Sequence, residues 1–391
     1  MVVHNQYKIA GGEDKVVEEE IKLLKSQGVN VSTFFVSNDD ISMEGLSNKI
    51  KFGINTVWSK EHYHILKKKL KEEKPDIVHF HNTFPRISPA AYYACQELNI
   101  PVVQTLHNYR LACPSALLMR EDTVCEKCLN GSLLNSIKYG CYRESRVQTI
   151  PLTTMLYTHR ILNTWNKKVD KIIALTGFAK CKIVETGIDE DRIVVKPNFI
   201  EKNNQFFCSK KDYVVFVGRL SKEKGVHLLL EAWKKNINKV NTELLIIGDG
   251  PENEQLVKEY GMVQSVKFLG RLNSAAVLEL VSKAKYLVVP SLWYEGFPMT
   301  IIEAFSVQTP VIGSNIGSLQ EIILDGVTGF HFENNNIDDL SNVLIKALNY
   351  PGYNNLVKNV CDNFEEKYTA EKNYKMLMQI YNEVLKEKRN E

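Results

Sequence analysis

The sequence lacks several features that would assign it to a specialised class of protein. It has no run of about 18 or more apolar residues, so no segment is predicted to span a membrane. Its net charge is only +3, which gives no support for a nucleic-acid partner. Residues 1–5 have neither the basic region nor the apolar stretch of a secretory signal. We therefore expect a cytoplasmic protein whose 8 cysteines are mostly reduced.

Low-complexity segments and short repeats are also missing, and the composition is that of a globular enzyme, with 44% hydrophobic and 24% charged residues. A chain of 391 residues exceeds one ordinary core, so we expect two domains. Short β-rich segments alternate with longer helical patterns, which predicts βαβ units and parallel sheets. In the first half the predicted strands are 29–35, 76–81, 102–106, 171–175 and 193–195, with a helix at 14–26.

The same pattern restarts at residue 213, and two doubly wound α/β domains joined near residues 197–208 explain this better than one large sheet. The predicted domains are 1–198 and 199–369, followed by a C-terminal helix in 370–391 that packs back on the first domain. The first strand looks clipped, because only residues 1–3 precede His4 and Asn5. Either the sheet tolerates a short strand or the natural start lies upstream. The predicted strands of the second domain are 213–217, 243–247, 265–268, 286–289 and 310–313, with a helix at 226–234.

Two cations follow the first strand of the second domain, at the end where parallel sheets bind ligands. Arg219 and Lys224 lie in the segment VGRLSKEKG, shortly before the predicted helix at 226–234. The free N–H groups of a helix N-terminus attract phosphate, and two cations beside them would neutralise a diphosphate. A solvated basic loop explains this segment equally well when it is considered alone.

Two glutamates with seven residues between them follow the strand at 286–289. Glu295 lies in the loop, Gly296 permits close approach of a ligand to the backbone, and Pro298 suits the start of a helix. Glu303 then lies just over one turn into that helix, where its carboxylate can accept hydrogen bonds from the hydroxyls of a ribose or a hexose. Taken alone, Glu303 is more simply an exposed helix residue. Its position after a strand and near a helix start favours a ligand.

Further segments at strand ends complete the pattern: IIGDGP, FLGR, PSLWYEGFP, IEAF and DGVTGF in the second half, and HNQY, GGED and TLHNYR in the first. Nearly the whole chain thereby resembles glycosyltransferase family 4. The resemblance implies an α/β GT-B fold, in which two Rossmann-like doubly wound domains face each other across a cleft. It also implies a retaining enzyme of surface polysaccharide or glycolipid synthesis. Such an enzyme moves a hexose from a UDP- or GDP-sugar to a carbohydrate or lipid-linked acceptor.

The resemblance also implies roles for individual residues. Arg219 and Lys224 would hold the donor diphosphate. Glu295 would bond the hydroxyls of the donor sugar and Glu303 those of the ribose. His107, which follows the strand at 102–106, would face the donor sugar, although a loop histidine can also simply cap a backbone group. The residues that would take part in catalysis are Arg219, Lys224, Glu295 and His107. The remaining residues implied on the donor side are Gly11, Gly12, Arg271, Leu272, Gly296, Phe297, Pro298 and Met299.

The acceptor side is less well defined. His81 and Asn82 end the predicted strand at 76–81, and Arg110 follows the strand at 102–106, so we expect these three to contact the acceptor. The lysine-rich segment 67–71 and an apolar aromatic face in 150–165 favour peripheral contact with the inner face of a membrane. Ordinary surface helices with a buried stripe explain both segments at least as well.

No metal or cofactor is expected in catalysis. As the resemblance implies, Arg219 and Lys224 would supply the positive charge that a metal ion brings elsewhere. Asp189 and Asp191 form an Asp-x-Asp pattern, which holds a divalent cation in another class of transferases. Here the pattern lies between a helix and the strand at 193–195, so we interpret it as a solvated turn.

Four cysteines interrupt the first domain in an insert near residues 110–145. Cys113, Cys125, Cys128 and Cys141 have the spacing C-x11-C-x2-C-x12-C. A Cys-x-x-Cys pair is the usual way to place two thiolates on one ion, so a structural Cys₄ zinc site is one interpretation. Disulfides and plain reduced cysteines in a packed loop are the others, and a cytoplasmic location disfavours disulfides.

Two other functions are compatible with the same fold. A sugar-nucleotide epimerase would need acid and base groups around the second carbon of the sugar, and the sequence shows no such set. A sugar-nucleotide binder without catalysis would keep the fold but lose turnover. The donor-side charges Arg219, Lys224, Glu295 and Glu303 are all present, which argues against a decayed site. The base, the sugar, the acceptor and the linkage stay open.

Overall fold

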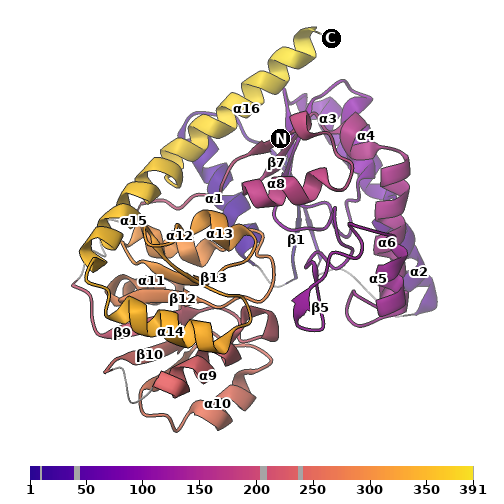
Figure 1. The fold of residues 1–391 in the computed structure, drawn as a ribbon. Coiled ribbons are helices and arrows are strands. Elements are labelled where there is room, and N and C mark those ends of the chain that lie inside the picture. The colour runs from indigo at the N-terminus through magenta and orange to yellow at the C-terminus, as the bar shows by residue number, and fades with distance from the viewer. Residues whose placement is uncertain (9–10, 39–44, 203–208, 237–240, 391) are drawn as a thin grey trace. The chain divides into compact units, whose positions relative to one another are not determined.

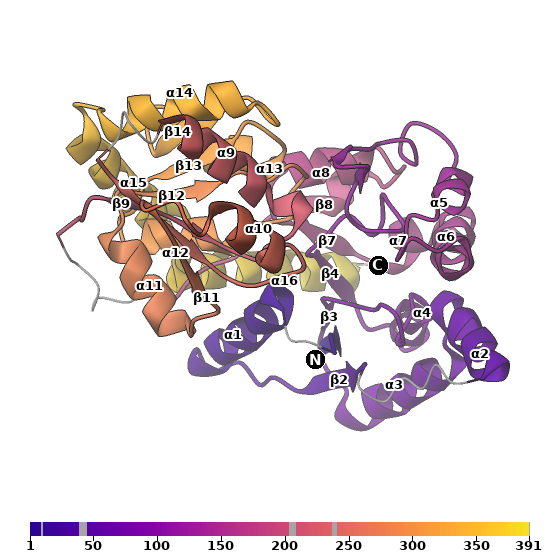
Figure 2. The same cartoon turned by 90° about the horizontal axis from the view of Figure 1, so that it is seen from below.

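The computed structural model describes residues 1–8, 11–38, 45–202, 209–236 and 241–390. Part of the predicted connection near 197–208 therefore lies outside the described residues. The chain divides into two compact units, each with one six-stranded parallel sheet flanked by helices (Figures 1 and 2). The first unit contains Met1–Leu118, Cys125–Asn198 and Asn373–Glu391; the second contains Met119–Val124 and Phe199–Lys372.

In the first unit the sheet has the strand order β2-β1-β3-β4-β7-β8. The order reverses beside β1, as in doubly wound folds, so that loops on the carboxyl side of the sheet can hold ligands. Its strands are β1 (Val2–Gln6), β2 (Thr33–Ser37), β3 (Val78–Phe80), β4 (Val102–Leu106), β7 (Lys171–Ala174) and β8 (Ile193–Val195). Its helices are α1 (Gly12–Ser26), α2 (Leu46–Val57), α3 (Lys60–Glu73), α4 (Ala90–Gln96), α5 (Leu134–Tyr139), α6 (Arg146–Ile161), α7 (Thr164–Lys168) and α8 (Gly177–Val184).

The first strand extends beyond the three apolar residues that open the sequence. β1 runs through His4 and Asn5 to Gln6 and pairs with β2 over its whole length. Both polar side chains lie inside, and each has a hydrogen-bond partner there. The Asn5 amide donates to Val36 O at 3.2 Å, and His4 Nε2 lies 2.9 Å from Asp14 Oδ1. Buried polar groups with partners are tolerated within a strand.

In the second unit the sheet has the order β11-β10-β9-β12-β13-β14. Alternate residues of its strands face two apolar layers: α9, α10 and α14 cover one face, and α11, α12, α13 and α15 cover the other. Its strands are β9 (Tyr213–Val217), β10 (Glu243–Ile247), β11 (Val266–Gly270), β12 (Tyr286–Val289), β13 (Val311–Ser314) and β14 (Gly329–Phe332), and a separate hairpin joins β5 (Met119–Arg120) to β6 (Thr123–Val124). Its helices are α9 (Val226–Asn236), α10 (Asn253–Tyr260), α11 (Ser274–Lys283), α12 (Met299–Ser306), α13 (Ser318–Ile322), α14 (Ile337–Leu348) and α15 (Tyr353–Lys367).

The last helix, α16 (Ala370–Asn390), is the yellow helix of Figure 1. Its apolar residues Leu377, Ile380, Tyr381 and Val384 pack in one buried cluster with Leu24, Val103 and Ile173 of the first unit. Residues 189–191 are exposed, and Glu190–Arg192 form a single 3₁₀ turn. This agrees with the interpretation of the segment as a solvated turn. No helix in the described ranges has the length and apolar character required to cross a membrane.

Candidate functional site

The second unit carries charged residues on the loops that follow its strands. Arg219 follows β9, Arg271 follows β11, and both side chains are exposed. Lys224 ends the 3₁₀ helix η2 (Lys222–Lys224), just before α9, and Glu295 lies in the loop after β12. Because β11, β10, β9 and β12 are parallel neighbours, their carboxyl ends share one edge of the sheet. These loops therefore belong to the edge where ligands bind in such folds.

The structure brings Lys224 and Glu295 into direct contact. Lys224 Nζ lies 2.7 Å from Glu295 Oε1, and the Ser291 hydroxyl donates to the same oxygen at 2.6 Å. The Glu295 side chain is 7% exposed and that of Lys224 is 27% exposed, so the carboxylate is fixed inside while the ammonium reaches solvent. Lys224 Nζ also lies 5.4 Å from the centroid of the Trp293 ring. This ion pair holds a cation in a defined place at the edge of the sheet.

The loops that carry this pair are joined by backbone contacts. Leu292 N–H donates to Glu223 O at 2.9 Å. Gly225 has a φ of +66°, and a Cβ there would lie 1.9 Å from Pro290 O. Only glycine fits at this point, because a side chain would drive the two loops apart. The backbone therefore fixes the position of Lys224 relative to the loop of Glu295.

The rest of the predicted donor side is distributed as follows. Glu303 lies half-buried in α12, which begins at Met299 after the extended Pro298. Gly296 O accepts a hydrogen bond from the Ser318 hydroxyl at 3.4 Å. Leu272 and Phe297 are partly buried and pack on the apolar core of the second unit. In the first unit, Gly11 precedes α1 and Gly12 begins it; both are exposed, and a Cβ at Gly12 would meet nothing within 4 Å.

In the first unit, two imidazoles meet at the ends of β3 and β4. His81 Nδ1 and His107 Nε2 are hydrogen-bonded at 3.0 Å, and the two rings stack with centroids 5.3 Å apart. Burial lowers the pKa of both histidines, and for His107 the lowering is large. Both rings are therefore neutral at pH 7. In the hydrogen bond between them, one ring nitrogen donates its N–H and the other accepts with its lone pair.

A buried ion pair lies behind these rings. Lys196 Nζ donates to Glu20 Oε2 at 3.0 Å, and His81 Nε2 lies 3.3 Å from Glu20 Oε1. Burial raises the pKa of Glu20, but the charge of Lys196 and the contacts with His81 and His79 outweigh it and hold that pKa well below its ordinary value. Glu20 is thus an ionised carboxylate inside the protein, paired as buried charges must be.

Glu20, His79 and His81 bring three potential metal-ligating atoms within 4.8 Å of one another. Their other contacts do not suit a metal ion. The Lys196 ammonium already neutralises Glu20. Both nitrogens of His79 are engaged, Nδ1 with the Tyr381 hydroxyl at 2.7 Å and Nε2 with that of Thr105 at 2.8 Å. The Lys196 ammonium and the two hydroxyls thus occupy most of the polar atoms of the cluster.

A cavity of about 40 Å³ opens at the ends of β3 and β4 and is lined by residues that include His81, Asn82, His107 and Arg110. The Asn82 side chain is already committed, because its amide donates to Asn5 O at 2.9 Å and its oxygen accepts from Phe84 N–H at 2.9 Å. The three proposed acceptor residues His81, Asn82 and Arg110 thus line one cavity, where the Asn82 side chain supports the backbone.

Two functional candidates were missed from the sequence. Glu13 lies in the first turn of α1, where its carboxylate accepts from the Tyr7 hydroxyl at 3.0 Å, and burial raises its pKa to about 8. Nothing in the sequence distinguishes it from an ordinary acidic residue at a helix start. Glu20 did have a signal: it lies three residues after Val17 and directly before Ile21, among the buried residues of α1. A carboxylate on such a face needs a partner.

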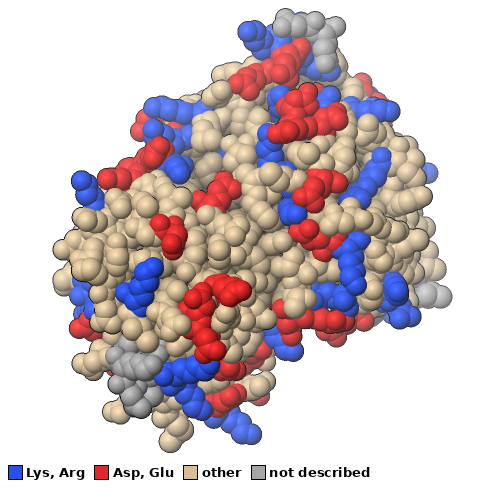
Figure 3. All heavy atoms as spheres, in the orientation of Figure 1, with Lys and Arg blue, Asp and Glu red and all other residues tan. Residues whose placement is uncertain are grey.

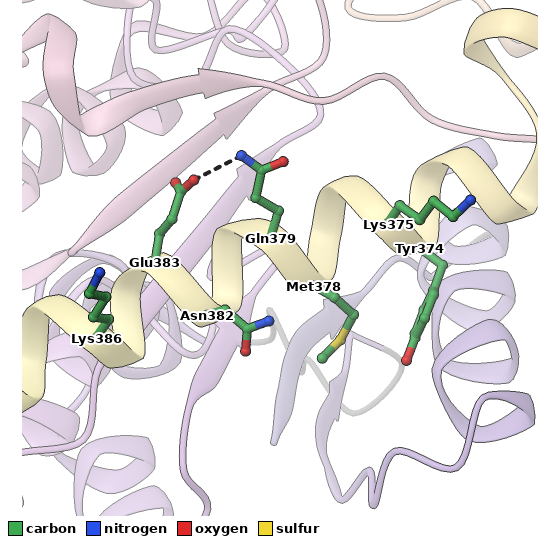
Figure 4. Close-up of a pocket in the computed structure, with 7 residues that line it drawn as sticks. All are labelled: Tyr374, Lys375, Met378, Gln379, Asn382, Glu383 and Lys386. Atoms are coloured by element: carbon green, nitrogen blue, oxygen red, sulfur yellow. Dashed lines mark hydrogen bonds between the residues drawn. The ribbon is translucent and has the colours of Figure 1, made fainter.

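Two surface features carry no site chemistry. A hollow of about 630 Å³ runs along α16 and is lined by residues of that helix alone, from Tyr374 to Lys386 (Figure 4). Its polar contact is internal, since Gln379 donates to Glu383 at 2.9 Å. Lysines and arginines alternate with acidic residues over the face in Figure 3, in keeping with the small net charge. Neither feature indicates a ligand.

Comparisons with known proteins agree on one family. A model described as Glycosyltransferase Family 4 matches residues 10–204, and one described as Glycosyl transferases group 1 matches residues 198–367. An uncharacterized glycosyltransferase of Methanocaldococcus jannaschii is 26% identical over 386 residues, which are 97% of this chain and 96% of that one.

A second relative has a more specific name. The UDP-Gal:α-D-GlcNAc-diphosphoundecaprenol α-1,3-galactosyltransferase of Escherichia coli is 25% identical over 326 residues, 81% of this chain and 77% of that one. Among solved structures, the Anabaena protein HepE in complex with UDP has a TM-score of 0.68 at 15% identity, over 98% of this chain and 99% of that one. This structural likeness shows a shared fold.

Proposed function

The chain belongs to glycosyltransferase family 4 and has the GT-B fold, and on that premise we propose that it transfers a hexose from a UDP- or GDP-sugar with retention of configuration. The observation that carries the proposal is the fixed pair of Lys224 and Glu295 at the carboxyl edge of the second sheet. A partly exposed ammonium beside a buried carboxylate offers a diphosphate its counter-charge and a sugar its hydrogen-bond acceptor. The name of the E. coli relative gives UDP-Gal as its donor, which supports a nucleotide sugar here.

The proposed chemistry is electrostatic. The bond between the anomeric carbon and the diphosphate oxygen breaks, and its electron pair stays on the diphosphate. Lys224 and Arg219 stabilise that charge without moving, which makes them effective in the transition state. An acceptor hydroxyl attacks the same face of the sugar, and its proton passes to the departing phosphate. Glu295 accepts from the sugar hydroxyls and Glu303 from the ribose. The charges are supplied by side chains, so turnover needs no metal.

In this proposal His107 bonds the donor sugar, and its tautomer is set by the groups behind it. An ionised Glu20 favours a proton on His81 Nε2, 3.3 Å away. The neutral His81 then accepts at Nδ1, so His107 must donate from Nε2 across the 3.0 Å contact. His107 Nδ1 is left with a lone pair. We therefore propose that His107 accepts a hydrogen bond from a hydroxyl of the donor sugar, and that Glu20 and His81 are positioning residues.

We further propose a carbohydrate or lipid-linked acceptor, reached by peripheral contact with a membrane. Exposed apolar side chains lie on two helices, with Ile54 on α2 and Val147 and Ile161 on α6. The helices pack together, since a Cβ added at Gly53 would lie 3.3 Å from Pro151 Cγ. Co-sedimentation with anionic lipid vesicles tests this. Binding that is unchanged in a Val147→Glu, Ile161→Glu variant would contradict it.

The function itself is tested by a thermal-shift screen of UDP- and GDP-sugars, followed by turnover of the best donor. A donor that binds only the folded chain raises its melting temperature. We expect one nucleotide class to do so and turnover to persist in excess EDTA. Conversion of the donor to an epimer without any acceptor, or activity restored only by Mn²⁺ or Mg²⁺, would contradict the proposal.

A further inference from the structure

Two groups of side chains in the first unit take no part in binding the donor. The first group is the four cysteines of the insert, Cys113, Cys125, Cys128 and Cys141. They form no disulfide, and no three of these described sulfurs lie within 4.8 Å of one another, so the arrangement does not show the geometry of a metal site. The second group joins the last helix, α16, to the histidines behind His107, and its hydrogen bonds are short and well defined.

Two polar side chains of α16 lie inside the first unit. Asn373 and Tyr381 are eight residues apart with Leu377 midway between them, and this spacing puts all three on one face of the helix. All three are nearly fully buried, and Leu377 and Tyr381 pack in one apolar cluster with residues of the first sheet. Polar groups buried in this way need hydrogen-bond partners, and both find them in the network around Glu20.

Asn373 acts on one oxygen of the Glu20 carboxylate through Lys196. The Asn373 amide donates from Nδ2 to Pro197 O at 2.7 Å, which turns its Oδ1 toward the Lys196 ammonium, 3.2 Å away. Lys196 Nζ in turn donates to Glu20 Oε2 at 3.0 Å. The lysine is therefore held on Oε2, and the other carboxylate oxygen, Oε1, faces the histidines.

Tyr381 acts on the tautomer of His79. The Tyr381 hydroxyl lies 2.7 Å from His79 Nδ1, and the Thr105 hydroxyl lies 2.8 Å from His79 Nε2. Burial raises the pKa of Tyr381 and lowers that of His79, so the phenol keeps its proton and the ring is neutral. A neutral ring donates from one nitrogen and accepts at the other. The phenol is a stronger acid than the threonine hydroxyl and hence the better donor, so His79 accepts at Nδ1 and donates from Nε2.

The tautomer of His79 decides which ring can bond Glu20 Oε1. This oxygen lies 3.4 Å from His79 Nδ1 and 3.3 Å from His81 Nε2. We propose that Tyr381 is a positioning residue that fixes the proton of His79 on Nε2. Glu20 Oε1 is thereby kept for the His81 N–H. The inference rests on the proposed function, in which His81 then accepts from His107 and leaves His107 Nδ1 free to accept from the sugar.

Loss of the Tyr381 hydroxyl should change the order of protons along the network. In Tyr381→Phe the lone pair on His79 Nδ1 would face the Glu20 carboxylate without a donor, which is unfavourable. The His79 proton therefore moves to Nδ1 and points at Glu20 Oε1, where it competes with His81. The pair of His81 and His107 then loses its single orientation, and part of the molecules carry the His107 proton on Nδ1. In those molecules His107 offers the sugar a donor in place of an acceptor.

The test is nuclear magnetic resonance of the full chain with its 9 histidines labelled with nitrogen-15. A ring nitrogen that carries a proton and one that does not have widely different chemical shifts, so the spectrum reports each tautomer directly. The signals lost in His79→Gln, His81→Gln and His107→Gln variants assign the three rings. In the wild type we expect the proton on Nε2 of all three rings, and in Tyr381→Phe on Nδ1 of His79.

Tyr374→Phe is the matched control, because Tyr374 is a partly buried tyrosine of the same helix that lies outside the network (Figure 4). It should leave all three tautomers and turnover unchanged. Turnover of Tyr381→Phe should fall about fivefold, the effect of one ordinary hydrogen bond. Its affinity for the nucleoside diphosphate selected by the donor screen should stay within about twofold of wild type, because the change lies in the first unit.

A wild-type chain with the His79 proton on Nδ1 would overturn the proposal, whether or not the variant folds. Tautomers that are the same in Tyr381→Phe and wild type, or changed tautomers with full turnover, would also overturn it. The spectrum is recorded without any sugar donor. A chain without transferase activity and a chain with the wrong tautomers are therefore distinguished.

Discussion

At the ends of their strands the two sheets carry different kinds of side chain. In the second unit the charges are on loops near solvent, where Lys224 is 27% exposed and Arg219 lies outside the core. In the first unit neutral imidazoles line the cavity, and the charges of Glu20 and Lys196 are paired behind them. Burying an unpaired charge is costly, so a group that meets a ligand's charge stays accessible. A group that orients a neutral hydroxyl can be buried and rigid.

Removing a cation from the second unit should have the largest effect. Lys224→Ala or Arg219→Ala is expected to lower turnover by about 10²–10³-fold, because each loses fixed stabilisation of the departing diphosphate. Lys222→Ala is the matched control, an exposed lysine two residues from Lys224. Steady-state rates with folded variants decide this. If Lys224→Ala is as active as Lys222→Ala, the Lys224 ammonium has no role in the mechanism.

The buried network of the first unit should matter through orientation. His81→Phe keeps a ring but removes the hydrogen bond to His107, and we expect turnover to fall about tenfold with unchanged UDP affinity. Burial and then the neighbouring His81 hold the pKa of His107 well below its ordinary value, so removing His81 should move the acid limb of the pH–rate profile to higher pH. His81→Gln should recover part of the rate, and exposed His64→Ala should change nothing. If the pH–rate profile does not shift, His81 only packs beside His107 and does not position it.

The two glutamates of the second unit should separate nucleotide from sugar. Glu303→Ala is expected to weaken the binding of free UDP or GDP. Glu295→Ala should leave that affinity unchanged and reduce only the additional affinity that the sugar of the full donor contributes. Loss of one such hydrogen bond to a charged group corresponds to about tenfold in affinity. Calorimetry with the nucleoside diphosphate and with the full donor measures both. Equal losses for both ligands in both variants would show that the division of roles is wrong.

The smallest effect is on stability at the start of α1. The pKa of Glu13 is raised to about 8, so the folded state keeps a proton that the unfolded chain loses near its ordinary value. Stability should therefore fall as pH rises from the ordinary glutamate pKa toward 8. Glu13→Gln should match the wild type in acid and melt a few degrees higher at alkaline pH. Exposed Glu18→Gln is the control; identical melting of Glu13→Gln and wild type at alkaline pH would refute the shift.

The elements of the fold that could be predicted from the sequence are those that depend on residues adjacent in the chain. β4, β8, β9, β10 and β12 begin and end where the hydrophobic runs predicted. The extent of β1 to Gln6 was not predicted, because His4 and Asn5 are polar yet buried with partners, which a hydrophobic pattern cannot show. β14 was missed; its four residues, Gly329–Phe332, include His331, whose ring contacts Ile323 O at 2.8 Å.

The same contrast holds for the two sites. The loop positions of Lys224 and Glu295 were predictable, because each residue lies between a strand and a helix, whereas the ion pair between them was not predicted. The ion pair of Glu20 and Lys196 joins residues 176 positions apart, and only the folded sheet brings them together. Local order in the sequence therefore identifies the loops at the carboxyl edge of the second sheet, but not the buried network behind His107.

The most direct test of the central claim compares the two units in one calorimetric experiment. UDP or GDP, whichever the donor screen selects, is titrated into wild type, Lys224→Ala and His107→Ala. We predict that Lys224→Ala loses about tenfold or more in affinity while His107→Ala binds the nucleotide within about twofold of wild type yet turns over slowly. Full nucleotide affinity in Lys224→Ala, or its loss in His107→Ala, would contradict the account.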